Sequence, residues 1–545
     1  MNSDASASRW LVLFGVYFGL AFSVYAPSFP GGPISDDYLY LMNPWVRGLS
    51  AASLPELLDP RSQATLALNN YAPLRPILHG LEWRLLYDES DVMATNRGYH
   101  LTNVVVHVVA SGLLAMLLVQ ASLPFAAAAL GGAFFLLHPA NVEAVAWLCE
   151  LWSGVALALG FGALLLQRRL PPLALALFAA ALLTKPQVVC ILPVALLRQW
   201  SFRREPGARG GWLWMGGWLL VFAAITGAQL LTFYESASGA RAPLHPDLAV
   251  QVRTIFALAG RYLAMALTGF GVAAFQEPPP AVSAFDPWWL FGFAATLGIT
   301  ALAVSALRRD REEAAWWVWG PAAFFPVSQL FPFLYPFGDR YLLFMLPGLI
   351  GGVLLAGARI GNAIGDPARR AVAARVAAAA AVALCLGFGV FSHARAAIWI
   401  SEDRVLADAA RRWPDGVPAH LLAARRAALA GDLDRTLAEL EACRARGWDY
   451  YGDMQNNRAY EGVRTTTRFQ ALIHDMAGDL IARASKTPRH SQMDLRDIAE
   501  AHRVRGEFAE AVAVLERAVL MRGPLDAELR PKLVALRAQA AREKP

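Results

Sequence analysis

Long apolar segments recur as far as residue 393, separated by polar connections that are short except for the one over 28–98. An α-helix needs about 20 apolar residues to cross the hydrocarbon core of a bilayer, so each such segment predicts a membrane-spanning helix. After residue 393 the pattern changes, and charged residues recur at helical spacing. The predicted spans are 10–27, 99–120, 123–138, 150–167, 170–184, 187–200, 212–233, 252–274, 287–307, 315–333, 341–358 and 371–392.

The composition excludes a string of soluble domains. Of the 545 residues, 56% are hydrophobic and 17% are charged, whereas soluble domains average about 45–50% and about 25%. We therefore expect an all-α protein, with a polytopic transmembrane helix bundle over 1–393, an outer loop over 28–98 and a soluble helical domain over 394–545. Arg9 precedes the first apolar run as in a signal peptide, but no clear A-x-A site follows, which favours a retained first span.

Arginine clusters between the apolar segments predict the topology, because short cytoplasmic loops are enriched in basic residues. If all of these clusters are cytoplasmic, the spans alternate consistently except at 252–274. That segment carries Arg253 and Arg261, and we expect it to be re-entrant or interfacial. The N-terminus is then cytoplasmic, while loop 28–98 and the tail are on the outer side. The clusters are Arg168 with Arg169, Arg198 with Arg203, Arg204 and Arg209, Arg308 with Arg309 and Arg311, and Arg369 with Arg370.

The charged tail has an internal repeat. Residues 419–447 and 495–523 each have the pattern of two helices joined by a glycine turn, at Gly431 and at Gly506. These glycines are separated by about two periods of ~34 residues, the period of tetratricopeptide repeats. We therefore expect a stack of helical hairpins, an architecture that usually provides a binding surface for a peptide or protein.

Four acidic residues fall near the predicted outer ends of spans. Asp36 and Asp37 in GGPISDDYLY are suited to accepting a proton or holding a cation; the alternative is a helix cap. Glu143 in HPANVEAVAW is a candidate acid, and the alternative is an acidic residue favoured by a helix dipole. Glu150 follows seven residues later, and helical periodicity predicts that it shares a face with Glu143.

Isolated cations at the same depth are candidate phosphate ligands. Lys185 in LLTKPQ is the only lysine before Lys486, and Arg340 precedes Tyr341 in FGDRYLL. Arg75 is a third candidate. Arginine and lysine bind phosphate oxygens through charge-assisted hydrogen bonds. The alternatives are a snorkelling lysine and an ion pair of Arg340 with Asp339.

Histidines within the apolar segments allow two interpretations. His100, Asn103 and His107 share one helical face, and His138 ends the third predicted span. For His107 we favour interhelical hydrogen bonding, whereas His100 is equally consistent with a functional site. A divalent metal stays an alternative, although the spacing specifies no metal site. The four cysteines show no paired spacing, no phosphate-binding glycine loop is present, and the basic charge is explained by topology rather than by nucleic acid.

Taken in order, these motifs resemble the integral-membrane GT-C glycosyltransferases. The likeness is greatest to the branch related to protein O-mannosyltransferases in which tetratricopeptide repeats follow the membrane part (TMTC-type and bacterial relatives). The first outer loop matches in SDDYLYLMN, and Leu151 stands where relatives commonly have an arginine. The other matching stretches are YAPLRPI, YHLTNVVVHVV, HPANVEAVAW, LLTKPQVVCILPVALL and FGDRYLLFMLPG.

The resemblance implies a sugar transferase that uses a polyprenyl-phosphate donor reached from the membrane. It implies a protein or glycan acceptor on the periplasmic side of a bacterial inner membrane. Asp36 or Asp37 would activate the acceptor hydroxyl, and Glu143 would be the acid of the HP…E motif. The donor phosphate would bind Lys185 and Arg340. From the residues themselves, we expect Arg75 as a further phosphate ligand and His100, His138 and Tyr341 as supporting residues.

Two other functions remain open at this point. The chain is alternatively a non-catalytic scaffold whose repeats bind a partner, as the degenerate middle repeat and Leu151 favour. A transporter of lipid-linked sugars is less favoured, because transporters often contain inverted repeats and the two halves of this chain show no convincing symmetry.

Overall fold

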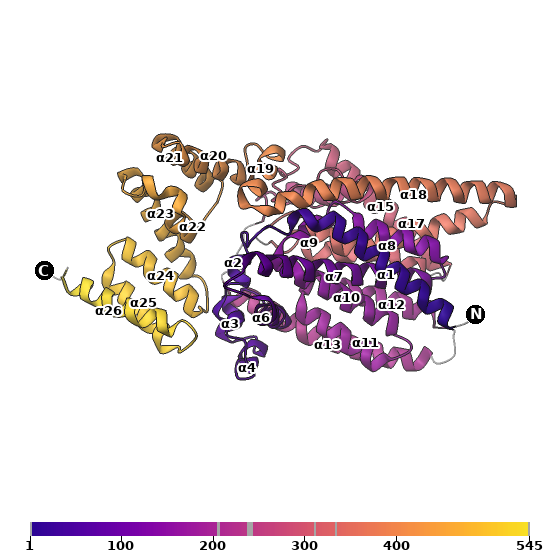
Figure 1. The fold of residues 1–545 in the computed structure, drawn as a ribbon, viewed down its shortest axis with the longest axis horizontal. Coiled ribbons are helices and arrows are strands. Elements are labelled where there is room, and N and C mark those ends of the chain that lie inside the picture. Colours follow the sequence, from indigo (N-terminus) through magenta and orange to yellow (C-terminus); the bar gives the residue numbers. More distant parts are fainter. Residues whose placement is uncertain (1–2, 204–207, 237–242, 310–311, 333–334, 543–545) are drawn as a thin grey trace. The chain divides into compact units, whose positions relative to one another are not determined.

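The structure is a computed structural model that describes residues 3–203, 208–236, 243–309, 312–332 and 335–542. Arg204 and Arg311, from the predicted cytoplasmic clusters, lie outside the described residues, as does the side chain of Arg209. In the described part of the chain, all regular secondary structure is helical (Figure 1). The prediction of an all-α protein is therefore confirmed.

The chain divides into two compact units. The first contains Met1–Tyr38, Glu82–Gly227 and Ala242–Glu402. The second contains Leu39–Leu81, Ala228–Arg241 and Asp403–Pro545. The second unit thus combines the charged tail with most of the long loop after the first span and with the end of one apolar helix. Each unit is described by itself below.

The helices of the first unit vary in length from single turns to long apolar rods. Pro171 and Pro287 begin α11 and α15, positions where the missing proline N–H costs nothing. The elements are α1 (Ser3–Tyr25), η1 (Ala26–Ser28), α2 (Asp37–Tyr40, which continues into the second unit), α7 (Val92–Gln120), α8 (Phe125–Leu137), α9 (Asn141–Ala146), η2 (Leu148–Glu150), α10 (Leu151–Leu166), α11 (Pro171–Thr184), η3 (Pro186–Cys190), α12 (Ile191–Ser201), α13 (Ala208–Glu235, likewise shared), α14 (Leu248–Thr268), α15 (Pro287–Arg308), α16 (Glu313–Phe324), η4 (Phe325–Val327), α17 (Asp339–Asn362), α18 (Pro367–Ala396) and η5 (Ala397–Ile400).

Seven helices in the described residues are long and apolar enough to cross a membrane, which supports a multi-pass membrane protein. Phe125–Leu137 and Pro171–Thr184 are apolar but shorter. The described part of the segment predicted at 315–333 contains the short helix α16 and the 3-10 turn η4, and α16 ends at Phe324, just before Pro326. The seven are Ala7–Ser28, Val92–Gln120, Leu148–Leu166, Gly210–Glu235, Pro287–Arg308, Asp339–Asn362 and Pro367–Ile400.

Small residues let the helices of the first unit approach closely. Figure 1 shows α1, α7 and α10 side by side, and α7 is in contact with both α1 and α10. A Cβ atom on Gly132 would lie 2.4 Å from the Tyr17 hydroxyl, which donates a hydrogen bond to the carbonyl of Ala129. Close approach of this kind is typical of membrane helix packing, where small residues line the interfaces.

The segment predicted at 252–274 forms α14, which is not among the seven helices long and apolar enough to cross. It begins after Asp247, whose carboxylate accepts from the N–H of Ala249, and ends at Gly269 with φ of 69°. Its arginines are both engaged within the unit. Arg253 Nε donates to the carbonyl of Ala281 (3.1 Å), and Arg261 lies over the Trp288 ring at 4.7 Å.

The tail contains the two helical hairpins that its repeat predicted. α20 pairs with α21 around Gly431, and α24 pairs with α25 around Gly506. The glycines adopt φ of 74° and 75°, left-handed values that favour glycine at a helix C-terminus. The elements of the second unit are α3 (Pro44–Arg47), α4 (Leu54–Leu58), α5 (Gln63–Ala67), α6 (Leu74–Leu86, which extends past the boundary), α19 (Glu402–Arg412, likewise), α20 (Val417–Leu429), α21 (Leu433–Ala445), α22 (Tyr451–Asn456), η6 (Arg458–Val463), α23 (Thr467–Ala484), α24 (Gln492–Val504), α25 (Phe508–Leu520) and α26 (Asp526–Arg542).

The tail and the long loop share a small apolar core. Met493 of the tail packs on a cluster that includes Trp45 and Leu57 of the loop. Gln63 Nε2 donates to the carbonyl of Met521 (3.0 Å). This packing explains why the two segments, which are far apart in sequence, form one compact unit.

Candidate functional site

Two of the candidate residues, Glu143 and Glu150, lie on either side of a break between two helices. α9 ends at Ala146, and Trp147 adopts an extended conformation with φ of −81° and ψ of 122° before η2 and α10 begin. Glu143 and Glu150 therefore do not share the face of one helix, and that prediction is wrong. Trp147 leaves the helical conformation, and its ring stacks on Trp399 with centroids 5.4 Å apart. Its indole N–H donates to the carbonyl of Ile34 (3.0 Å).

Arg340 joins the two carboxylates in spite of this break. It lies in the first turn of α17, where its backbone N–H donates to Glu143 Oε2 at 2.8 Å. Its guanidinium also donates to Glu143, and its Nε lies 3.5 Å from Glu150 Oε1. Nη2 donates to the Tyr341 hydroxyl (3.3 Å). Arg340 thus pairs with two glutamates that are distant in sequence, and not with its neighbour Asp339 as the alternative interpretation proposed.

Lys185 reaches the same carboxylates from another element. Pro186 ends α11, and Lys185 is extended, as expected for a residue before proline. Its Nζ lies 2.9 Å from Glu150 Oε2 and donates to the Ser153 hydroxyl. The ammonium group is also 4.2 Å from the centre of the Trp152 ring. Lys185 therefore does not snorkel towards solvent.

These contacts form one buried chain of charges, which we call the ion network: Glu143, Arg340, Glu150 and Lys185. Their exposed fractions are 4%, 6%, 3% and 5%. Burial of a single charge is costly unless a partner compensates it, and here two cations face two carboxylates. Glu150 occupies the centre, because one of its oxygens meets Lys185 and the other meets Arg340.

Asp37 adjoins the ion network through the backbone. Its Oδ1 accepts from the N–H of Cys149 at 2.7 Å, and its Oδ2 accepts from the N–H of Ile34 at 2.8 Å. Burial raises the pKa of the Asp37 carboxyl to about 7, partly offset by these two N–H groups. Asp36 precedes it in a turn and is half-buried. The two aspartates therefore differ sharply in environment.

The histidines hold elements together around the site. His100 Nε2 lies 3.2 Å from the Gly31 carbonyl, and its ring stacks on Phe29. His138 Nε2 lies 3.2 Å from the carbonyl of Ala266. His107 Nε2 lies 3.1 Å from the Leu136 carbonyl of α8, so the predicted interhelical bond is confirmed.

Arg75 belongs to the second unit. It is buried there, with its guanidinium 4.1 Å from the centre of the Tyr40 ring, and its Nη2 donates to the Leu68 carbonyl at 3.1 Å. The structure thus brings together Glu143, Lys185, Arg340 and Tyr341, with Asp37 beside them. Arg75 instead contacts Tyr40 and Leu68 of the second unit.

Two contributors were missed by sequence reasoning. Ser153 lies three residues after Glu150 and on the same side of the first turn of α10, a spacing that could have revealed it. Asn103 was predicted only as part of a polar helix face, but its amide meets the segment that carries both glutamates. Among the described residues, no group of three or more His, Cys, Asp or Glu side chains could hold a metal ion.

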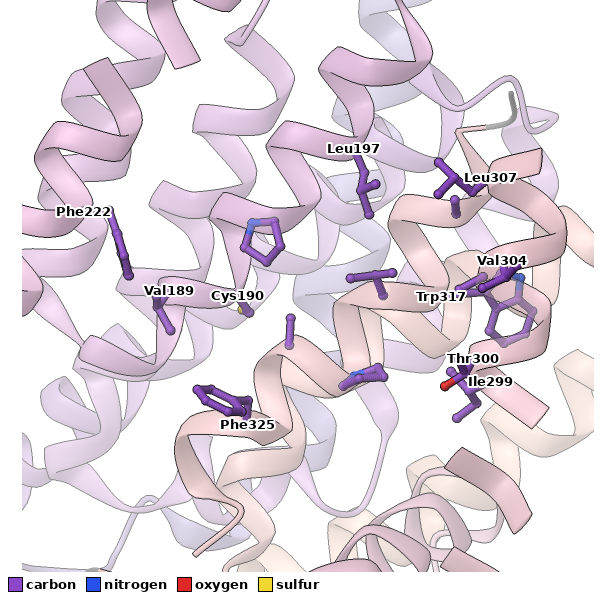
Figure 2. A pocket seen from close by; sticks show the side chains of 16 residues that line it. Val189, Cys190, Leu197, Phe222, Ile299, Thr300, Val304, Leu307, Trp317 and Phe325 are labelled. Carbon is purple, nitrogen blue, oxygen red and sulfur yellow. The ribbon is translucent and has the colours of Figure 1, made fainter. Parts of the chain in front are cut away.

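An apolar cavity of about 610 Å³ lies in the first unit, between α12, α13, α15 and α16 (Figure 2). Trp317, Val304 and Phe325 line it, together with Val189 and Cys190. The last two end η3, the element that directly follows Lys185. Along the sequence, Val189 of the cavity wall therefore follows Lys185 of the ion network by only a few residues.

Comparison with family models, curated proteins and solved structures finds no match to this chain.

Proposed function

We propose that this protein is a membrane glycosyltransferase of the GT-C type, which moves a sugar from a polyprenyl-phosphate donor to a hydroxyl group. One observation supports this function above all. Glu143 and Arg340 come from motifs 197 residues apart, and they form one buried ion network with Lys185, beside Asp37. Ionisable residues inside a membrane protein are costly and are therefore usually functional.

The charges suit transfer from a sugar phosphate. Such a reaction needs cations on the departing phosphate and a base near the acceptor oxygen. Lys185 and Arg340 would bind the phosphate, which would take over contacts that Glu150 and Glu143 make in its absence. A carboxylate of the Asp36–Asp37 pair would accept the proton of the acceptor hydroxyl. A single displacement of this kind would invert the configuration at the sugar.

The apolar cavity would hold the start of the lipid chain. Its wall includes Val189 and Cys190, which follow Lys185 closely in sequence, and we propose that a donor whose phosphate binds Lys185 would place its lipid chain here. The side chains that line it are apolar except for Thr300 and Cys190, and pockets of this size that are mostly apolar are typical of small-molecule sites.

The arginine clusters would orient the enzyme in a bacterial inner membrane. The N-terminus would be cytoplasmic, and the site and the tail would face the periplasm. The helical hairpins of the tail, which we propose are tetratricopeptide-like, would recruit a protein or glycan acceptor, as such repeats commonly do.

The test is an assay with purified protein and polyprenyl-phosphate sugars, in which release of the lipid phosphate is measured. We expect release with at least one donor, and a loss of about 100-fold or more in Lys185→Met and Arg340→Gln. Arg198→Gln is the matched control, because Arg198 is also a buried arginine paired with a glutamate (Glu312, 2.6 Å) but lies outside the ion network. No release with any common donor would contradict the proposal, as would equal losses in all three variants.

A second function, a non-catalytic scaffold, is favoured by one feature of the ion network. Its two cations are already neutralised by Glu143 and Glu150, as in a purely structural element. The same assay distinguishes the two. A scaffold would release no phosphate, and Lys185→Met would change its stability alone.

A further inference from the structure

The break between α9 and α10 leaves backbone groups without helical partners. Trp147 is extended, so the carbonyl of Val145 and the N–H of Cys149 do not pair as they would in a continuous helix, whereas the carbonyls of Trp147 and Leu148 also accept from the N–H groups of Glu150 and Leu151. Backbone groups that stay unpaired inside a membrane protein cost several kcal/mol. Some other part of the molecule must therefore satisfy this segment if its geometry is to persist.

Two side chains from distant elements do so. Asn103 of α7 donates its amide Nδ2 to the carbonyls of Val145 and Trp147, both at 3.1 Å. The same nitrogen lies 3.4 Å from the carbonyl of Leu148. On the other side, Asp37 accepts from the N–H of Cys149 at 2.7 Å. The segment from Val145 to Cys149 is thus bound by one donor side chain and one acceptor side chain.

We propose that Asp37 and Asn103 are positioning residues that fix segment 145–150, and with it the two glutamates that orient Arg340 and Lys185. Asp37 is poorly placed to meet an acceptor hydroxyl, because it is only 1% exposed and each of its oxygens accepts a backbone N–H. The half-buried Asp36 is then the base of the pair. The link to the donor phosphate rests on the proposed function, whereas the effect on the segment does not.

The first experiment measures the segment itself, by hydrogen–deuterium exchange of purified protein followed by mass spectrometry. Asp37→Ala and Asn103→Asp should accelerate exchange of the peptide covering 143–153 by about tenfold, the effect of losing one buried hydrogen bond. Asn103→Asp has nearly the same shape as the native side chain but has no amide donor. Asp37→Asn, which keeps one acceptor oxygen, should restore protection, and peptide 191–201 should not change.

Asp36→Ala is the matched control, because it removes the neighbouring carboxylate and leaves both clamping side chains in place. Equal acceleration in Asp36→Ala, or unchanged exchange in both Asp37→Ala and Asn103→Asp, would overturn the inference. This result would not depend on any transferase activity.

The second experiment separates the roles in catalysis. Asn103→Asp should raise the KM for the polyprenyl-phosphate sugar by about tenfold, while Asp36→Ala should lower kcat and leave that KM unchanged. A fall in kcat alone for Asn103→Asp would overturn the inference. If exchange changes as expected but no donor reacts even with the native protein, the proposed function fails and the positioning of the segment stands.

Discussion

The most direct test of the ion network is Glu150→Gln. The substitution keeps the shape of the side chain and removes its charge. Glu150 meets Lys185 through one oxygen and Arg340 through the other. In the variant, Glu143 would still pair with Arg340, while Lys185 would lose the carboxylate that it contacts. We therefore expect a large loss of stability from a change of a single atom type.

The distances allow a rough magnitude. At an effective dielectric constant of about 20, attractions across 2.9 and 3.5 Å are each worth about 5 kcal/mol. Desolvation of the charges offsets part of this, and removal of one partner from a buried pair typically costs about 3–5 kcal/mol. The double variant Glu150→Gln with Lys185→Met leaves one carboxylate and one cation. Because it restores the balance of charge, it should recover more than half of the loss.

The assay is unfolding by sodium dodecyl sulfate in mixed micelles, with the free energy of unfolding compared between variants. Glu312→Gln is a suitable control, because its partner Arg198 is buried but Glu312 itself is partly exposed, so a smaller loss is expected. A loss below about 1 kcal/mol for Glu150→Gln would refute a buried and compensated network. A double variant less stable than Glu150→Gln would refute the argument from charge balance.

Two further predictions concern other parts of the first unit. Because burial raises the pKa of Asp37 from 3.8 to about 7, the native state holds a proton that the unfolded state has lost, and native stability falls as pH rises through this window. The free energy of unfolding of Asp37→Asn, relative to that of the native protein, should therefore rise by up to about 4 kcal/mol between pH 4 and pH 7. A difference between the two proteins that does not change with pH would contradict this. Gly292→Ala should destabilise the contact of α14 with α15 by about 1–3 kcal/mol, because the new Cβ would lie 1.8 Å from the Phe256 carbonyl oxygen. Gly298→Ala on the same helix is the control, because a Cβ there has open space. In a thermal unfolding assay, only Gly292→Ala should lower the stability.

The candidate residues were predictable to different degrees. Glu143, Lys185 and Arg340 could be selected from sequence because an isolated charge among apolar residues is conspicuous. Their partners could not be selected. Nothing in FGDRYLL shows that Arg340 bonds Glu143 rather than Asp339, since that choice depends on which helices are neighbours. The expected single helix through Glu143 and Glu150 failed at Trp147, where tertiary contacts of the indole ring outweigh local helical preference.

The sequence by itself determined the helical class, the multi-pass character and the hairpins of the tail. These follow from apolar length, charge segregation and glycine spacing, all of which act locally along the chain. Only the tertiary structure decided that Asp37 binds the backbone of Cys149, that Glu150 lies between two cations, and that the tail shares a core with loop 39–81. Such pairings depend on contacts between residues far apart in the chain, and the burial that makes them energetically important exists only once the helices have packed.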